Sequence, residues 1–198
     1  GFPLGHSMSP VIHRELFKIA NIDGEYNLYE ISPENLNNAF SELKNLSGFN
    51  VTIPHKISVI QNLDELDEKA ALFGAVNTVL VNGKTKGFNT DCDGFIRAVK
   101  MAGITLEGDV LLCGSGGVSR MFAFECVLAG CSLTVAVREA DIPAANILQA
   151  EIKEKLGKNI EVINIKDVAK GYHLIINGTP VGMFPNTDAC ILPKNIIQ

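Results

Sequence analysis

The chain has 198 residues, 46% of them hydrophobic, and a formal net charge of −5 at pH 7. This length allows one large domain or two small ones, each with a buried core. The acidic balance provides no basic field that would hold a phosphate backbone, so the composition argues against a nucleic-acid partner. No run of about eighteen apolar residues and no basic-then-apolar leader is present. We therefore expect a cytoplasmic protein with no membrane partner.

The five cysteines and four histidines have no spacing typical of a metal site. No C-x-x-C pair occurs, so we predict no metal. The odd number of cysteines is typical of a reducing compartment. Cys113 and Cys126 lie in apolar segments and are interpreted as small buried hydrophobic residues. His6 and His13 are interpreted as structural.

Secondary-structure signals in the first half predict a mixture of helices and short strands. Ser9 is a candidate N-cap for a helix that begins at Pro10. The dipeptide Asn82-Gly83 favours a two-residue type I′ turn between two strands. The predicted elements are a loop over 1–9, helix 10–20, strand 26–31, a helix opened by Ser32-Pro33 and ended by Gly48, strand 49–53, helices 54–62 and 64–73, and a hairpin of strands 76–81 and 84–89.

After Asp91 the pattern changes to a strict alternation of helices and strands. Such an alternation predicts an α/β fold with a parallel, doubly wound, Rossmann-like sheet. We expect a substrate-binding domain over residues 1–91 and a dinucleotide-binding domain over residues 92–198, with the site in the cleft between them. The predicted elements are helix 93–102, strand 109–113, helix 118–129, strand 132–137, helix 144–156 and strands 160–165 and 173–177.

The strand 109–113 runs into a glycine-rich turn that opens the next helix, which is the context that a dinucleotide fingerprint requires. Gly114 would make the tight turn, and Gly116 would let the backbone approach a pyrophosphate. Ser119 stands where a third small residue allows close helix packing. A purely structural turn is the alternative. The following strand ends at Arg138 and Glu139, of which an arginine favours NADP and an acid favours NAD.

Two segments of the first half carry candidate substrate residues. Ser7 and Ser9 stand at a predicted helix N-terminus, where a substrate carboxylate would bind, although Ser9 could serve only as a cap. Lys56 is placed in the first turn of a predicted helix, where the dipole would lower its pKa and make it a usable base. The alternative for an isolated lysine is a solvated surface charge.

The predicted hairpin brings a carboxylate toward the same region. With the turn at Asn82-Gly83, Asn77 falls opposite Phe88, so Asn77 and Asp91 emerge at the same end of the ribbon. Asp91 could also cap the helix that follows it.

Six motifs in register resemble the shikimate dehydrogenase family: G-H-S-M-S-P-V-I-H (5–13), N-V-T-I-P-H-K (50–56), G-A-V-N-T (74–78), N-T-D (89–91), G-S-G-G-V-S-R (114–120) and I-N-G-T-P-V-G-M (176–183). The resemblance implies reversible NADPH-dependent reduction of 3-dehydroshikimate to shikimate, in the pathway to chorismate and the aromatic amino acids. It implies that Lys56 and Asp91 are the catalytic pair. Substrate would be bound by Ser7, Ser9, Thr52, Asn77 and Asp91, and cofactor by Gly114, Ser115, Gly116, Gly117, Val118, Arg138, Asn177, Gly178 and Thr179.

The chain departs from the family pattern after the second cofactor strand. The family usually has N-R-T-x-x-R there, whereas this chain has V-R-E-A-D-I over 137–142, so one arginine of the 2′-phosphate clamp is absent. Two alternatives stay open: an NAD-preferring quinate/shikimate dehydrogenase, or a non-catalytic homologue that binds a hydroxy acid. We also expect the chain to be part of a longer polypeptide, and its protein to be a monomer or a homodimer.

Overall fold

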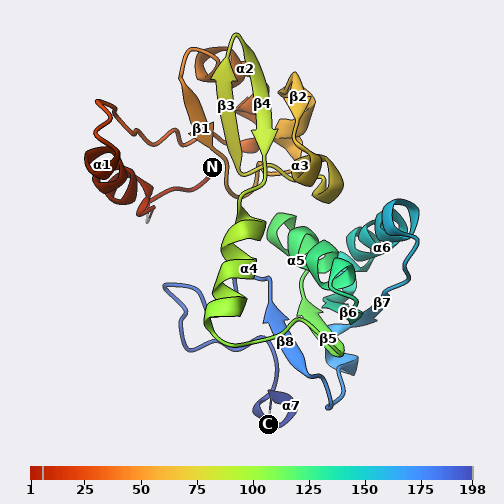
Figure 1. Cartoon of the computed structure of the whole chain (residues 1–198). Coiled ribbons are helices and arrows are strands. Elements are labelled where there is room, and N and C mark those ends of the chain that lie inside the picture. Colours follow the sequence, from red (N-terminus) through yellow and green to blue (C-terminus); the bar gives the residue numbers. More distant parts are fainter. Residues whose placement is uncertain (6, 198) are drawn as a thin grey trace. The chain divides into compact units, whose positions relative to one another are not determined.

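The computed structural model describes residues 1–5 and 7–197, so His6 lies outside the described residues. The chain divides into two compact units, residues 1–66 with 76–87 and residues 67–75 with 88–198 (Figure 1). The division expected after residue 91 differs from this packing, because residues 67–75 and 88–91 fall with the second unit. The reason is that Phe73 packs in the core of that unit, with its ring 5.8 Å from the ring of Phe124.

The first unit contains a small mixed sheet with the strand order β1-β3-β4-β2. Strand β1 is antiparallel to β3, and β2 is parallel to β4. A Cβ on Gly87 would lie 2.6 Å from Leu63 and 2.8 Å from Val76, so glycine lets these side chains pack across the sheet. The elements are α1 (Ser9–Ala20), α2 (Leu36–Leu43), β1 (Gly48–Asn50), β2 (Glu65–Leu66), β3 (Thr78–Asn82), β4 (Lys84–Phe88) and 3-10 helices Pro33–Asn35 and Ser58–Asn62.

The helix predicted over 10–20 is confirmed. The helix predicted from Ser32-Pro33 to Gly48 is shorter, with a 3-10 turn over Pro33–Asn35 and α2 over Leu36–Leu43. The helix predicted over 54–62 is wrong. Only Ser58–Asn62 is helical, and it is a 3-10 helix. A regular helix would need the carbonyl of Lys56 to accept from Ile60. Instead that carbonyl accepts from the amide of Val76 at 2.7 Å, and Ile60 donates to Ile57. A tertiary hydrogen bond therefore replaces the first helical turn.

Three other predictions for the first half need correction. Residues 26–31 form no strand, since the bond from the Ile31 amide to the Gly1 carbonyl is not continued as a ladder among the described residues. Residues 65–66 pair with β4, so helix α3 covers only Glu68–Phe73. The turn at Gly83 is not type I′, because Asn82 remains in β3 and only Gly83 has a positive φ, of 70°.

The second unit is built around the predicted parallel sheet, which is confirmed with the strand order β7-β6-β5-β8. This order is that of the first four strands of a Rossmann fold, with the reversal of strand order between β5 and β8. The elements are α3 (Glu68–Phe73), α4 (Asp91–Met101), β5 (Asp109–Cys113), α5 (Gly117–Leu128), β6 (Ser132–Val137), α6 (Ile142–Leu156), β7 (Glu161–Asn164), β8 (Leu174–Asn177), α7 (Lys194–Ile197) and 3-10 helices Glu139–Asp141 and Ile165–Asp167.

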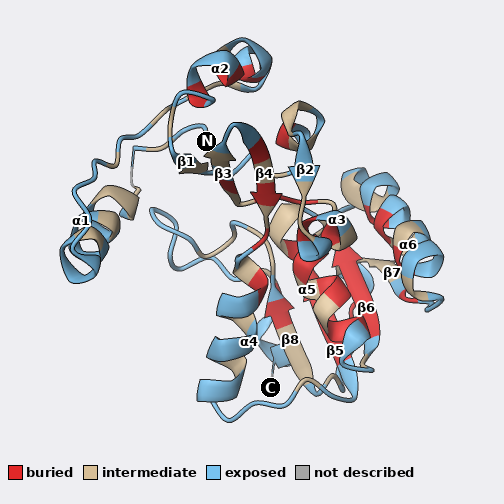
Figure 2. Ribbon diagram, turned by 45° about the horizontal axis from the view of Figure 1, so that its top comes forward, coloured by how far each residue is buried: buried red, intermediate tan, exposed pale blue. Residues whose placement is uncertain are grey.

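Strand β5 is buried on both faces, as a central parallel strand should be. Val110 and Leu112 belong to the core cluster that includes the buried side of α5, whereas Leu111 and Cys113 belong to a second cluster with Val168. Figure 2 shows β5 and β6 as almost continuous buried segments. The glycine-rich turn after β5 therefore starts from a rigid strand.

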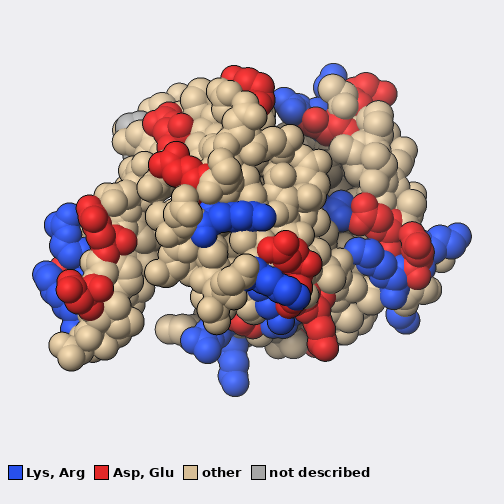
Figure 3. Space-filling model, turned by 90° about the horizontal axis from the view of Figure 1, so that it is seen from above, with Lys and Arg blue, Asp and Glu red and all other residues tan. Residues whose placement is uncertain are grey.

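The charged side chains of the surface are mixed in sign. On the face drawn in Figure 3, Lys and Arg side chains lie beside Asp and Glu side chains. Exposed ion pairs such as Lys84–Glu65 and Arg138–Asp141 are part of this pattern. None of the described helices is long and apolar enough to cross a membrane.

Candidate functional site

Three of the predicted substrate residues line one cavity of the first unit. This cavity has a volume of about 130 Å³ and is bordered by Ser7, Ser9 and Thr52. Tyr26 and Asn50, which the sequence reasoning missed as site residues, line it as well. A larger cavity of about 660 Å³ borders Arg14 and Asp23 but none of the predicted substrate residues. The smaller cavity is therefore the candidate substrate site.

The two serines occupy a helix start without capping it as predicted. Helix α1 begins at Ser9 itself, and Met8 stands at the cap position with no side-chain capping bond. The hydroxyl of Ser7 accepts from the amide of Ser9 at 3.4 Å, a long bond. The prediction of Ser9 as an N-cap is wrong, because its amide is already inside the helical segment. Both hydroxyls border the cavity rather than a completed cap.

A chain of hydrogen bonds connects the cavity wall to Asn77. The hydroxyl of Tyr26 donates to Asn50 Oδ1 at 3.1 Å, and Asn50 Nδ2 donates to Thr78 Oγ1 at 3.2 Å. The hydroxyl of Thr78 donates to Asn77 Oδ1 at 3.1 Å. The ring of Tyr26 is held by stacking on His13, with centroids 3.9 Å apart. Because each group donates to the next, the chain orients the amide of Asn77.

Lys56 and Thr52 lie in a segment that is tied to the residues before β3. The amide of Val51 donates to the carbonyl of Asn77 at 2.7 Å, and the carbonyl of Lys56 accepts from Val76 at the same distance. His55 is buried, and its Nε2 lies 2.6 Å from the carbonyl of Ile31. These bonds bring the backbones of residues 51–56 and 76–77 together. The helix-dipole argument for Lys56 fails, since no helix begins at this residue.

Asp91 is the first residue of α4 and belongs to the second unit, whereas Lys56 belongs to the first. The predicted alternative, Asp91 as the N-cap of its helix, is wrong. Asn89 performs that task instead, because its Oδ1 accepts from the amide of Asp91 at 3.2 Å. The carboxylate of Asp91 is therefore at the first turn of α4, outside the cap.

The glycine-rich turn and the loop after β8 are in contact in the second unit. Ser119 is fully buried, and its hydroxyl donates to the carbonyl of Gly178 at 3.0 Å. A Cβ on Gly178 would lie 2.3 Å from this hydroxyl, and one on Gly114 would lie 2.9 Å from Thr179 Cγ2. Gly114 also has a φ of 105°. The small residues at these positions let the two loops meet at the reversal of strand order.

Gly116 differs from the other glycines of this turn. Its φ of −73° is open to any residue, and a Cβ there would meet no atom of the described residues within 4 Å. Neither backbone strain nor packing explains this glycine. The open space lies at the N-terminus of α5, where amide groups and the helix dipole favour an anion. This observation fits a dinucleotide whose pyrophosphate approaches the backbone at Gly116.

Asn177 shapes the loop after β8. Its Oδ1 accepts from the amide and the hydroxyl of Thr179, at 3.0 and 2.7 Å, and its Nδ2 donates to the carbonyl of Val181 at 2.9 Å. The side chain is thus engaged inside the loop. These bonds hold Thr179 and Val181 close to Asn177.

The two residues that bear on cofactor choice have different partners. Arg138 is exposed and pairs with Asp141 at 2.7 Å. Glu139 accepts from Asn164 Nδ2 at 2.7 Å. The guanidinium is thus paired through a weak surface contact, while the carboxylate is held against the end of β7. Among the described residues, no group of three or more His, Cys, Asp or Glu side chains could hold a metal ion.

Sequence reasoning also missed the role of Arg120. This buried side chain donates from Nε to the carbonyl of Phe73 at 2.9 Å and pairs with Glu151. It thereby ties residues 67–75 to α5 and α6. The arginine of the glycine-rich motif was visible in the sequence, but its partners are remote along the chain.

The parallel sheet with its glycine-rich turn and the hydroxyl-lined cavity define a two-unit α/β protein of the dinucleotide-binding type. Residues 1–79 match the family model described as the shikimate dehydrogenase substrate binding domain. The chain is 44% identical over 207 residues to the NADP⁺-dependent shikimate dehydrogenase of Methanococcus maripaludis strain C6, an alignment that covers 100% of this chain and 72% of that protein. The chain belongs to the shikimate dehydrogenase family.

Solved structures agree with this assignment. A crystal structure of shikimate dehydrogenase in complex with NADP⁺ superposes with a TM-score of 0.89 at 36% identity, over 99% of this chain and 70% of that one. Shikimate 5-dehydrogenase from Listeria monocytogenes, in complex with shikimate and NAD, superposes with a TM-score of 0.84 at 30% identity, over 97% of this chain and 71% of that one.

Proposed function

We propose that this protein is an NADP-dependent shikimate dehydrogenase, which reversibly reduces 3-dehydroshikimate to shikimate in the biosynthesis of chorismate and the aromatic amino acids. The observation that carries the proposal is the gathering of Ser7, Ser9 and Thr52 around one small cavity. A cyclic hydroxylated acid needs several hydrogen-bonding groups in one place, and this cavity provides three hydroxyls close to a helix start.

The proposed substrate contacts are those that the family resemblance implies. Ser7 and Ser9 bind the carboxylate at the N-terminus of α1. Thr52, Asn77 and Asp91 bind the ring hydroxyls. The orientation that Thr78 gives to the amide of Asn77 supports the assignment, because its hydroxyl donates to Oδ1 and so fixes the direction of the amide.

The proposed acid–base pair is Lys56 and Asp91. Oxidation of a secondary alcohol requires a proton to leave oxygen as hydride leaves carbon, and reduction of the ketone requires the reverse. The ammonium of Lys56 delivers a proton to the carbonyl oxygen during reduction, and its neutral amine takes a proton from the hydroxyl during oxidation. Asp91 accepts a hydrogen bond from a substrate hydroxyl. A bound NADPH supplies the hydride.

The dinucleotide is proposed to bind along the loops of the second unit. Gly114, Ser115, Gly116, Gly117 and Val118 would surround the pyrophosphate, and Asn177, Gly178 and Thr179 would lie at the nicotinamide end. The open space at Gly116 supports the first assignment. Arg138 would bind the 2′-phosphate of NADP after exchanging its surface pair with Asp141.

A second candidate is an NAD-preferring quinate/shikimate dehydrogenase. The specific observation in its favour is Glu139, whose carboxylate is fixed by Asn164 at the end of the second cofactor strand. An acid at this position hydrogen-bonds a free ribose 2′-hydroxyl and repels a 2′-phosphate. The structure of the Listeria monocytogenes relative is a complex with shikimate and NAD, so NAD should be compared with NADP as the cofactor of this protein.

One assay tests both candidates. The rate of reduced nicotinamide formation is measured with shikimate or quinate, each with NADP⁺ or NAD⁺. The proposal expects the highest kcat/KM for shikimate with NADP⁺. A higher value with NAD⁺ favours the second candidate. Absence of turnover with either cofactor, together with tight shikimate binding in calorimetry, would favour a non-catalytic homologue.

We further propose that the protein acts in the cytoplasm as a monomer or a homodimer. The cysteines of the described residues are free, which is typical of a reducing compartment. Light scattering of the purified protein distinguishes the two oligomeric states.

A further inference from the structure

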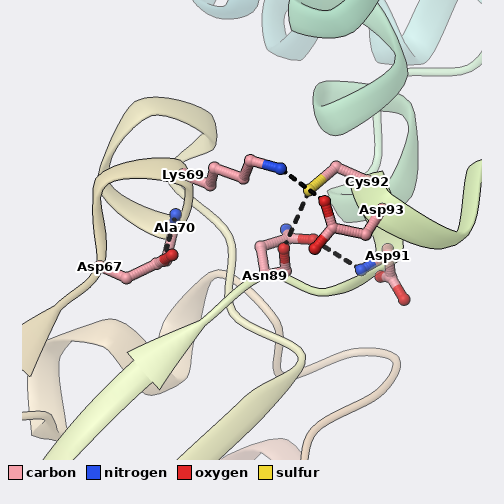
Figure 4. A network of polar contacts seen from close by, with 7 residues as sticks. All are labelled: Asp67, Lys69, Ala70, Asn89, Asp91, Cys92 and Asp93. Atoms are coloured by element: carbon pink, nitrogen blue, oxygen red, sulfur yellow. Dashed lines mark hydrogen bonds and ion pairs between the residues drawn. The ribbon is translucent and has the colours of Figure 1, made fainter. Parts of the chain in front are cut away.

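Asn89 is a buried polar residue at the junction between β4 and α4, and its side chain is only 3% exposed. Figure 4 shows it in a network of polar contacts that surrounds the start of α4. In the sequence, Asn89 is marked only by its place in the N-T-D motif. A buried amide needs hydrogen-bond partners, so its contacts indicate what it holds.

The side chain of Asn89 uses both its donor and its acceptor. Nδ2 donates to the carbonyl of Ala75 at 3.0 Å, and Oδ1 accepts from the amide of Asp91 at 3.2 Å. Its backbone carbonyl accepts from the thiol of Cys92 at 3.1 Å. The amide side chain offers a donor on one atom and an acceptor on another, whereas the carboxylate of an aspartate has no donor. The side chain of Asn89 therefore matches both partners, donating to one backbone carbonyl and accepting from one backbone amide.

These bonds replace an ordinary helix cap. Thr90 stands at the cap position of α4 but makes no side-chain capping bond. In contrast, α3 is capped by Asp67, whose Oδ1 accepts from Ala70 at 2.7 Å. Asn89 thus satisfies the first amide of α4, and that amide belongs to Asp91.

Ala75, whose carbonyl accepts from Asn89 Nδ2, is the second partner of this side chain. Ala75 is fully buried and stands two positions before Asn77 along the chain. A second contact holds the same helix start, because Lys69 of α3 pairs with Asp93 at 2.6 Å. The Lys69–Asp93 pair is exposed and contributes little rigidity. The buried side chain of Asn89 links the backbone of Asp91 to the segment that ends at Ala75.

We infer that Asn89 is a positioning residue for the acid–base chemistry: it holds the backbone of Asp91 through one hydrogen bond and anchors itself on Ala75 through another. The inference rests on the proposed function, since it assigns a role to Asn89 only through Asp91. Displacement of a reacting group by about 1 Å can lower a rate by about 100-fold. Loss of this positioning should therefore lower kcat while leaving NADP binding unchanged.

The test compares Asn89→Ala and Asn89→Asp with wild type in the full chain. Asn89→Asp keeps the acceptor for the Asp91 amide but places a carboxylate against the carbonyl of Ala75. Both variants should lose about 10-fold to 100-fold in kcat for shikimate oxidation. Retained NADP affinity shows that the second unit is folded. Asn89→Ser, a milder change, replaces either variant that fails to fold.

A matched control separates positioning from stability. Thr134 is also buried in the second unit, and its hydroxyl donates to Glu161 at 3.3 Å, between β6 and β7. Thr134→Val removes a comparable hydrogen bond and should lower Tm without lowering kcat. If Thr134→Val and Asn89→Ala reduce kcat equally, the effect of Asn89 is only structural and the inference is overturned.

A double variant distinguishes this inference from the proposed function. If Asn89 acts through Asp91, Asn89→Ala should add little loss in an Asp91→Ala background. If the loss of kcat in the double variant equals the product of the losses in the two single variants, the inference is overturned. Activity in wild type, loss in Asp91→Ala and normal kcat in Asn89→Ala would also overturn it while leaving the proposed function intact. Absence of activity in wild type would instead contradict the proposed function.

Discussion

Replacement of Gly116 by alanine should separate cofactor binding from folding. A Cβ at this position meets no described atom within 4 Å, and the φ of −73° is compatible with alanine. Alanine is a poorer cap residue than glycine by up to about 1 kcal/mol. The less flexible unfolded chain returns about 0.4 to 1 kcal/mol. The net change in the free energy of unfolding is within about 1 kcal/mol, so Tm should move by no more than about 2 to 4 °C.

The same methyl group should weaken NADP binding strongly. It would occupy the space into which we place the pyrophosphate, and forcing an extra carbon into a packed contact costs about 1 to 3 kcal/mol. This cost corresponds to a loss in affinity of about 5-fold to 150-fold. Isothermal titration with NADP⁺, paired with a thermal melt, measures both quantities on one sample.

Two other glycines provide matched controls. Gly114→Ala should lower Tm as well as affinity, because its φ of 105° strains alanine and its Cβ would lie 2.9 Å from Thr179. Gly94→Ala, at an exposed position inside α4 with no atom within 4 Å of the new Cβ, should raise Tm slightly and leave NADP affinity unchanged. Wild-type NADP affinity in Gly116→Ala would refute the placement of the pyrophosphate.

Three further predictions concern the substrate cavity, pH and thiol chemistry. Tyr26→Phe removes the donor to Asn50 and should raise the KM for shikimate about fivefold, at unchanged NADP affinity, in steady-state kinetics. Burial raises the pKa of Glu125 in the folded protein. The contribution of this group to the free energy of unfolding is therefore complete below its unfolded pKa and is lost as pH rises through the folded pKa. Glu125→Gln should raise Tm at neutral pH but not at acidic pH, which thermal melts over a series of pH values measure. Burial raises the pKa of Cys113 to about 11 and of Cys126 to about 12, so mass spectrometry at neutral pH should find the exposed Cys190 alkylated first, and faster labelling of Cys126 would contradict the packing.

The sequence predicted the second unit far better than the first. Strands β5, β6 and β8 are short apolar runs between clear turn signals, and a central parallel strand such as Asp109–Cys113 is recognisable as a continuous apolar run because both of its faces are buried. In the first unit, the segment around Lys56 shows the limit of local patterns. Its proline suggested a helix start, but the hydrogen bond from Val76 to the Lys56 carbonyl competes with the first helical turn.

The chemistry of the candidate site could be predicted from the sequence, but the contacts that hold its residues in place could not. The hydroxyls of Ser7 and Ser9 indicated a carboxylate ligand, and the family resemblance added Thr52; the structure brings these three residues to one cavity. The positioning role of Asn89 depends on the carbonyl of Ala75, fourteen positions away, and no local sequence pattern predicts this contact. Supporting contacts of this kind follow from the fold, because their partners are backbone atoms that carry no sequence signal.

The most direct test of the proposed chemistry is the kinetics of Lys56→Ala, with shikimate and NADP⁺ as substrates and calorimetric measurement of shikimate binding alongside. If Lys56 moves the proton, kcat should fall by at least about 100-fold while the affinities for shikimate and NADP⁺ stay close to those of wild type. Unchanged kcat in this variant would contradict the central claim.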